Sequence, residues 1–117
     1  MRDSLETAKR YIEMNHPECN GAMLAGSCAR GEATATSDLD IIILYTGKDS
    51  AYRESLFYED WPVEVFVYTG DAYHKFFHND AARAIPSLPR MASEGIVLKD
   101  AEALVVKMKE EAKEVLA

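Results

Sequence analysis

The sequence predicts an α/β domain with a mixed β-sheet of about four to five strands flanked by helices. Short apolar runs rich in β-branched residues are too brief for typical helices and fit strands instead. Segments near both ends of the chain carry apolar residues at helical spacing. Helices and strands therefore alternate at both ends, whereas two consecutive strands form a hairpin in the middle. This order favours a sheet of mixed direction.

The first helix is expected over residues 4–15, because Ala8, Tyr11 and Ile12 fall near one face and Pro17 lies just past the end. Strands are expected at 22–25, at 39–45 and, as a hairpin with a tight connection around 59–62, within 52–69. The remaining elements are a helix from Asp71 towards Ala84, a short helix at 90–93, a strand at 96–98 and a final helix at 101–116.

The composition and net charge of the chain argue against several classes of function. The 117 residues are expected to form one domain, residues 1–117, and they carry a net charge of -7. Proteins that bind long nucleic acid usually present a basic surface. Because this chain is acidic, we expect no long nucleic acid as a partner. We also expect no membrane partner, because no apolar run approaches the roughly 20 residues that cross a bilayer. The two cysteines, Cys19 and Cys28, form no metal-binding pattern, which favours a reduced, cytoplasmic setting without structural zinc.

A loop for phosphate is predicted where the first strand ends. Gly26 permits a close approach of a ligand to the backbone, and the Ser27 hydroxyl can join the amide groups that follow it in an anion site. Arg30 is a candidate phosphate ligand because its guanidinium is planar, with pairing to Glu32 or Asp38 as the alternative. These residues predict a site for the phosphates of a nucleotide.

Two carboxylates open the next strand. Asp38 and Asp40 are two residues apart, so their side chains point to one face with Cα atoms roughly 6.6 Å apart. Like charges so placed repel each other unless a cation lies between them. A pair of Mg²⁺ ions about 3.5–4 Å apart fits this arrangement. Ser37 is assigned to the nucleotide-binding loop, where its hydroxyl holds the turn and orients Asp38.

Glu64 is the candidate third carboxylate. It interrupts the apolar run from Val63 to Val67, and a carboxylate rarely occupies such a strand without a partner. If its strand lies beside the strand that begins at Asp38, Glu64 shares the face of the two aspartates. There it serves as a metal ligand or as the base for an incoming hydroxyl.

Together these residues resemble the nucleotidyltransferase superfamily that includes DNA polymerase beta, kanamycin nucleotidyltransferase and the minimal nucleotidyltransferases of bacteria. The family signature is a Gly-Ser pair, an aspartate-hydrophobic-aspartate triplet that opens the next strand, and an acidic residue on a later strand. Gly26-Ser27, Ser37-Asp38-Leu39-Asp40 and Glu64 match it in order and spacing. The third acid is Glu rather than Asp, as in the kanamycin-type branch. The resemblance covers roughly residues 20 to 68.

The resemblance implies a nucleotidyltransferase fold and a metal-dependent enzyme. It implies Asp38, Asp40 and Glu64 as catalytic residues and ligands of two Mg²⁺ ions, with Mn²⁺ as a substitute, and ATP as the nucleoside triphosphate. The reaction moves a nucleoside monophosphate to an acceptor hydroxyl with release of pyrophosphate. The acceptor is a small molecule or a protein; the alternative function is that of an antitoxin-like minimal enzyme that modifies a helical ribonuclease toxin.

The sequence shows no pocket for an acceptor. We therefore expect either the N-terminal part of a longer protein or a subunit that completes its site as a homodimer or with a helical partner domain.

Overall fold

The computed structural model describes residues 4–29, 31, 38–82 and 87–116. One five-stranded sheet lies at its centre, with strands in the order β3-β4-β2-β1-β5. The strands are β1 (Gly21–Ala25), β2 (Leu39–Tyr45), β3 (Ser50–Tyr58), β4 (Trp61–Thr69) and β5 (Ile96–Asp100). β2 and β4 run parallel, and the other neighbours are antiparallel. The predicted mixed α/β sheet is thereby confirmed, with five strands.

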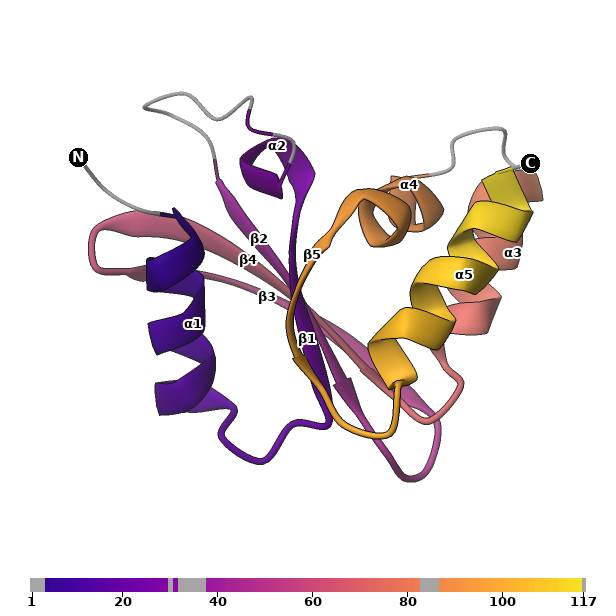
Figure 1. Ribbon diagram of the computed structural model, residues 1–117, viewed down its shortest axis with the longest axis horizontal. Helices are drawn as coiled ribbons and strands as arrows, with labels where there is room; N and C mark the ends of the chain where they lie inside the picture. The colour runs from indigo at the N-terminus through magenta and orange to yellow at the C-terminus, as the bar shows by residue number, and fades with distance from the viewer. Residues whose placement is uncertain (1–3, 30, 32–37, 83–86, 117) are drawn as a thin grey trace.

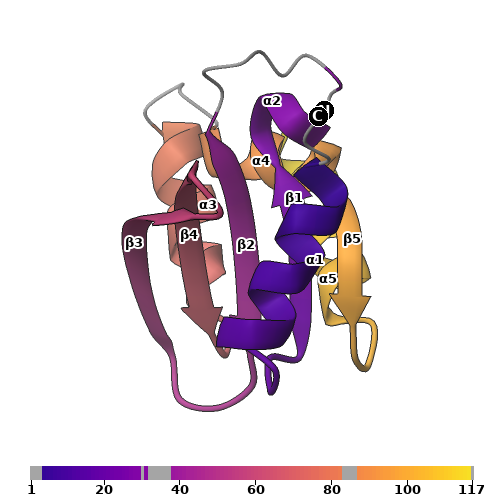
Figure 2. The same ribbon diagram turned by 90° about the vertical axis from the view of Figure 1, so that its left-hand side faces the viewer.

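Helices cover both faces of the sheet, as Figures 1 and 2 show. One face carries α1, and the other carries α3, α4 and α5; α2 follows β1 at one end of the sheet. The helices are α1 (Ser4–Asn15), α2 (Gly26–Ala29), α3 (Tyr73–Ala82), α4 (Ser87–Glu94) and α5 (Leu104–Leu116). In the described part of the chain, no helix is long and apolar enough to cross a membrane.

Strand periodicity divides the core into two layers. On β2, Leu39, Ile41 and Ile43 pack in the cluster under α1, and Ile42 and Leu44 pack in the cluster under the other three helices. All five of these side chains are buried because β2 is central and covered on both faces. Asp40 has the same parity as Ile42 and Leu44, so it lies on the face of α3, α4 and α5.

The hairpin between β3 and β4 turns at Glu59 and Asp60. Both residues have positive φ, 51° and 63°, as a two-residue turn that matches the twist of the strands requires. This turn lies inside the predicted connection at 59–62 and fixes which residues of β3 face which residues of β4. The register of the hairpin is therefore set locally.

Three helices begin later or earlier than the sequence predicts: α3 begins at Tyr73 rather than at Asp71, and the other two differ for identifiable reasons. The short helix begins at Ser87 rather than near residue 90, since Pro89 lies in its first turn, where no amide hydrogen is needed. The last helix begins at Leu104 rather than at 101, because the Asp100 carboxylate accepts hydrogen bonds from the amides of Val105 (2.9 Å) and Val106 (3.3 Å).

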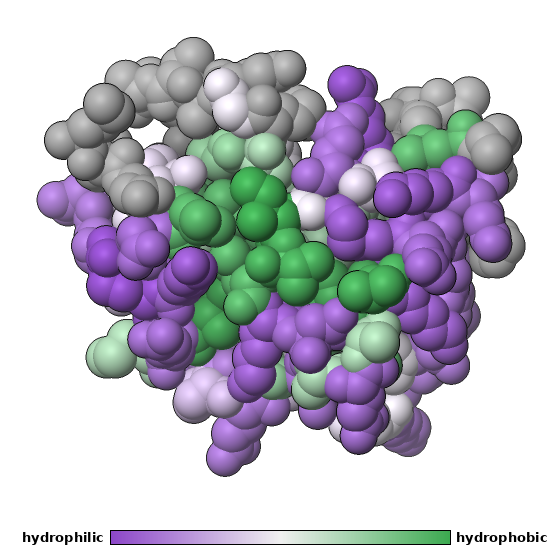
Figure 3. Space-filling view, viewed as in Figure 1, coloured by the Kyte–Doolittle hydropathy of each residue, from purple (hydrophilic) through white to green (hydrophobic). Residues whose placement is uncertain are grey.

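The two sheet edges differ in character. β3 is exposed along most of its length, and β5 closes the opposite edge beside β1. Apolar side chains gather at the surface over β5, where Ile96 and Val97 are exposed (Figure 3).

Candidate active site

The parallel pairing of β2 with β4 brings two of the predicted carboxylates together. Asp40 is the register partner of Glu64, and Leu39 is that of Val63. Paired residues on adjacent strands point to the same face, so both carboxyl groups lie on the side of α3, α4 and α5. The two side chains are half-buried, whereas the apolar partners Leu39 and Val63 are fully buried in the other layer. The expected neighbourhood of Asp40 and Glu64 is confirmed at the level of the backbone.

Gly26 lies against the carboxyl group of Asp40. Its φ of 69° belongs to the left-handed region, which a residue with a side chain adopts only at a cost. A Cβ atom at this position would collide with Oδ2 of Asp40. The sequence analysis expected a ligand to approach the Gly26 backbone closely; the structure shows the Asp40 carboxyl group there. Glycine is therefore needed here both for the turn and for the placement of Asp40.

Cys28 connects α2 to the beginning of β2. Its Sγ donates a hydrogen bond to the backbone oxygen of Asp38 at 3.5 Å. Burial raises the pKa of this thiol, and the charges of Asp40 and Asp38 raise it further. The raised pKa disfavours the thiolate form of Cys28 beside the aspartates.

Glu64 is held by two residues of β3. The Arg53 guanidinium contacts Oε2 through Nε at 2.8 Å and Nη2 at 2.6 Å, and the Ser55 hydroxyl donates to Oε1 at 3.1 Å. Ser55 is the register partner of Glu64, and Arg53 precedes Ser55 by two residues on the same face of β3. Both oxygens of Glu64 are thus engaged on the side away from Asp40.

Arg53 and Ser55 were not predicted as site residues. The sequence did contain a signal for them: a two-residue turn at Glu59 and Asp60 pairs Ser55 with Glu64 in an antiparallel hairpin. Arg53 then falls diagonally opposite Glu64, within reach of a long side chain.

The predicted site residues fall into three groups. Gly26, Asp40 and Glu64 are brought together, with Ser27 next to Gly26 in α2. Asp38 is exposed directly before β2. Arg30 and Ser37 lie outside the described residues. Among the described residues, no three acidic, His or Cys side chains converge as a ready-made metal site.

A pocket lies next to Arg53, the ion-pair partner of Glu64, although the sequence showed no pocket. It has a volume of about 290 Å³ and lies between the edge strand β3, its neighbour β4 and the helices α3 and α4. Phe66 and Tyr68 line it from β4, on the same face as Glu64. Arg53 belongs both to this pocket and to the ion pair with Glu64.

The sequence model of one protein family, described as "Polymerase beta, Nucleotidyltransferase", matches residues 6–71, which is more than half of the chain. The chain belongs to this nucleotidyltransferase family. The matched segment includes Gly26, Ser27, Asp38, Asp40 and Glu64. The family assignment thus rests on the part of the chain that carries the candidate site.

A solved structure supports the nucleotidyltransferase fold independently. The nucleotidyltransferase-like protein from Exiguobacterium sibiricum 255-15 superposes with a TM-score of 0.60 at 13% sequence identity. The match covers 93% of this chain and 38% of that chain. No curated protein sequence matches significantly.

Proposed function

We propose that this nucleotidyltransferase domain transfers a nucleoside monophosphate from a nucleoside triphosphate, with ATP as the expected donor, to an acceptor hydroxyl. The observation that carries this proposal is the register of β2 and β4, which places Asp40 beside Glu64 next to the Gly26-Ser27 turn. Family membership supports nucleotidyl transfer as the general activity.

The chemistry of the donors supports Mg²⁺ as the cofactor. Asp38, Asp40 and Glu64 offer only carboxylate oxygens, the ligands that Mg²⁺ prefers, and Mn²⁺ accepts the same set. Asp40 and Glu64 lie on neighbouring strands. Glu64 would have to give up its ion pair with Arg53 in order to serve as a ligand of the metal. When bound, Mg²⁺ supplies positive charge that offsets the carboxylates and the triphosphate.

The remaining roles belong to this chain's own residues. The Gly26-Ser27 turn holds the phosphates, and Glu64 takes the proton of the acceptor hydroxyl. The acceptor oxygen forms a bond to the α-phosphorus while the bond from the α-phosphorus to the bridging oxygen breaks, and pyrophosphate leaves with the electron pair. Holding the two reacting atoms within about 3–3.5 Å of each other is the main task of the site.

The resemblance leaves two acceptor classes within this proposal. One is an antibiotic-like small molecule, and the other is a side chain of a helical ribonuclease toxin. The proposal also includes an additional wall of the site. This wall would come from a second copy of the chain or from a helical domain.

The test is the double variant Asp38→Asn/Asp40→Asn. We expect it to abolish Mg²⁺-dependent ATP binding in calorimetry and to abolish transfer from α-labelled ATP, while the circular dichroism spectrum stays unchanged. The matched control Glu13→Gln/Glu18→Gln removes the same charge from exposed positions and should bind as the wild type does. Equal Mg²⁺-dependent binding by the wild type and the Asp38/Asp40 variant would overturn the proposal.

A further inference from the structure

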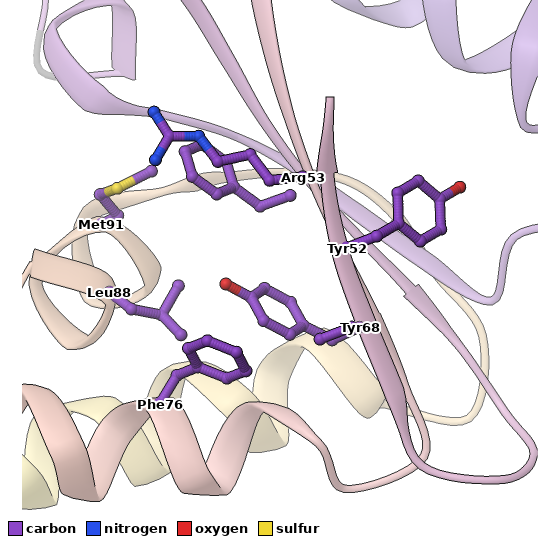
Figure 4. A pocket seen from close by; sticks show the side chains of 8 residues that line it. Tyr52, Arg53, Tyr68, Phe76, Leu88 and Met91 are labelled. Atoms are coloured by element: carbon purple, nitrogen blue, oxygen red, sulfur yellow. The ribbon is translucent and has the colours of Figure 1, made fainter. Parts of the chain in front are cut away.

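The pocket that Arg53 connects to Glu64 has walls that are mainly apolar. Tyr68 and Phe76 meet in an edge-to-face contact with ring centroids 5.4 Å apart. Leu88 and Met91 of α4 close the side opposite the sheet (Figure 4). Its volume of about 290 Å³ is at the lower limit of the range typical of small-ligand sites, roughly 300–1,000 Å³. The pocket therefore fits a compact apolar group, such as one or two rings.

The Arg53 guanidinium contacts both an aromatic residue of the pocket and the carboxylate of Glu64. The guanidinium carbon of Arg53 lies 5.1 Å from the centroid of the Phe66 ring, and the same guanidinium binds Glu64. Phe66 follows Glu64 by two residues on one face of β4, about 6.6 Å along the strand. A ring seated against Phe66 can therefore present a substituent to Glu64 without leaving the pocket.

The order of the strands separates this pocket from the phosphate turn. Across the sheet, the strands lie in the order β1, β2, β4, β3. The Gly26-Ser27 turn follows β1 and Asp40 lies on β2. Glu64 lies on β4, and Arg53 lies on the edge strand β3. Neighbouring strands are about 4.8 Å apart, so β1 and β3 are separated by roughly 14 Å. The triphosphate and the occupant of the pocket thus approach Glu64 from opposite sides, as a donor and an acceptor must.

We infer that this pocket binds the acceptor, and that the acceptor carries a neutral aromatic ring with a hydroxyl group. The inference rests on the proposed nucleotidyl transfer. A flat ring gains apolar burial between Phe76 and Met91 and contact with the Arg53 cation. A polycationic amino sugar finds no acidic side chain among the described residues that line the pocket, and Arg53 repels it.

The bonds formed and broken in the transfer step balance when the acceptor is an aryl hydroxyl. The aryl hydroxyl oxygen bonds to the α-phosphorus, pyrophosphate leaves, and the hydroxyl proton passes to Glu64. The product is an aryl ester of the nucleoside monophosphate. No oxidant or further reactant is required.

4-Methylumbelliferone is a suitable probe because it is a planar aromatic hydroxyl compound whose fluorescence is lost when its hydroxyl is esterified. We expect saturable binding that a nonhydrolysable ATP analogue with Mg²⁺ does not displace. Phe76→Ala should weaken probe binding at least tenfold; this side chain is 41% exposed, so its truncation leaves the core intact. Met91→Ala serves as a second variant from the opposite wall.

The matched control is Tyr52→Ala. Tyr52 is an aromatic residue of β3 that is 51% exposed. It is among the residues that line the pocket, but its ring points away from the cavity, so its truncation leaves the apolar side chains inside in place (Figure 4). The control should bind the probe within twofold of the wild type. Equal losses in Tyr52→Ala and Phe76→Ala, or displacement of the probe by the ATP analogue, would overturn the pocket as the acceptor site.

Two further arms separate this inference from the proposed function. The Asp38→Asn/Asp40→Asn variant should still bind the probe although it no longer transfers. A wild type that transfers to kanamycin but not to the probe supports the proposed function and overturns the aromatic acceptor. N-acetyl-tyrosinamide in place of the probe distinguishes a phenol carried by a protein from a free one.

Discussion

The two sides of the candidate site are built differently. On one side, β1, α2 and β2 hold Asp40 against the Gly26 backbone, so the carboxyl group is fixed by a close contact with no room for a side chain at position 26. On the other side, β4 and β3 hold Glu64 through an ion pair with Arg53, whose side chain is 65% exposed. The first contact is steric and local. The second is electrostatic and open to solvent, so it can be exchanged.

This difference bears on the proposed reaction. There the phosphates are bound beside the rigid contact at Gly26, whereas the proton passes to a carboxylate whose ion-pair partner can be displaced. Exposed ion pairs are worth about 0.2–1 kcal/mol, so a bound ligand can replace Arg53 at little cost. We therefore expect variants of the β1–β2 side to affect nucleotide binding, and variants of the β3–β4 side to affect the acceptor and the rate.

Among the single substitutions, the largest effect is expected for Glu64→Gln. The amide keeps the shape of the side chain but cannot take the acceptor's proton, so the rate of pyrophosphate release from ATP with 4-methylumbelliferone should fall by about 10²–10⁴. Binding of ATP measured by calorimetry should change less than threefold. If ATP binding is lost in proportion to the rate, Glu64 belongs to the nucleotide side and the comparison fails.

Gly26→Ala should weaken the opposite side. The Cβ atom collides with the Asp40 carboxyl group and is strained at φ 69°, so we expect at least tenfold weaker ATP binding and a lower free energy of unfolding in urea titration. Gly31→Ala is the matched control: its φ is 72°, but no described atom lies within 4 Å of its Cβ position. In the control, the free energy of unfolding should fall only by the backbone strain, about 1–2 kcal/mol. Equal destabilisation in both variants would show that contact with Asp40 has no role.

The sequence predicted these two sides unequally. The β1–β2 side is a continuous stretch of the chain, so its glycine, serine and aspartates could be recognised as one motif. The β3–β4 side depends on pairing between residues separated along the chain, and only the turn at Glu59 and Asp60 determines that Ser55 faces Glu64. Most strands and helices were predicted because their periodicities are local.

The pocket could not be predicted in the same way. Phe66, Phe76 and Met91 come from a strand and two helices, and each reads as an ordinary core residue in the sequence. Whether they fill a core or leave a cavity depends on the placement of α3 and α4 relative to the edge of the sheet. That placement is a property of tertiary packing, for which local propensity and periodicity give no signal.

A moderate effect is expected for Arg53→Gln. Loss of the guanidinium removes the cation beside Phe66 and one of the two partners of Glu64, so the KM for 4-methylumbelliferone should rise about fivefold to tenfold while the affinity for ATP stays within twofold. Arg10→Gln is a matched control because it removes another exposed arginine–glutamate pair, with Glu59, away from the pocket. A weaker ATP affinity with an unchanged KM for the acceptor would place Arg53 on the nucleotide side.

The smallest effect is expected for Ser55→Ala. This variant removes the 3.1 Å hydrogen bond to Oε1 of Glu64 and leaves the ion pair with Arg53 in place, so the rate should fall only about twofold to fivefold. Ser50→Ala, at the other end of the same strand, should leave the rate unchanged.

The double variant Arg53→Gln/Ser55→Ala then measures whether the two residues position Glu64 together. A loss larger than the product of the two single losses supports joint positioning, because each partner alone keeps Glu64 in place. Strictly multiplicative losses would show that Ser55 and Arg53 act independently and that only Arg53 connects Glu64 to the pocket.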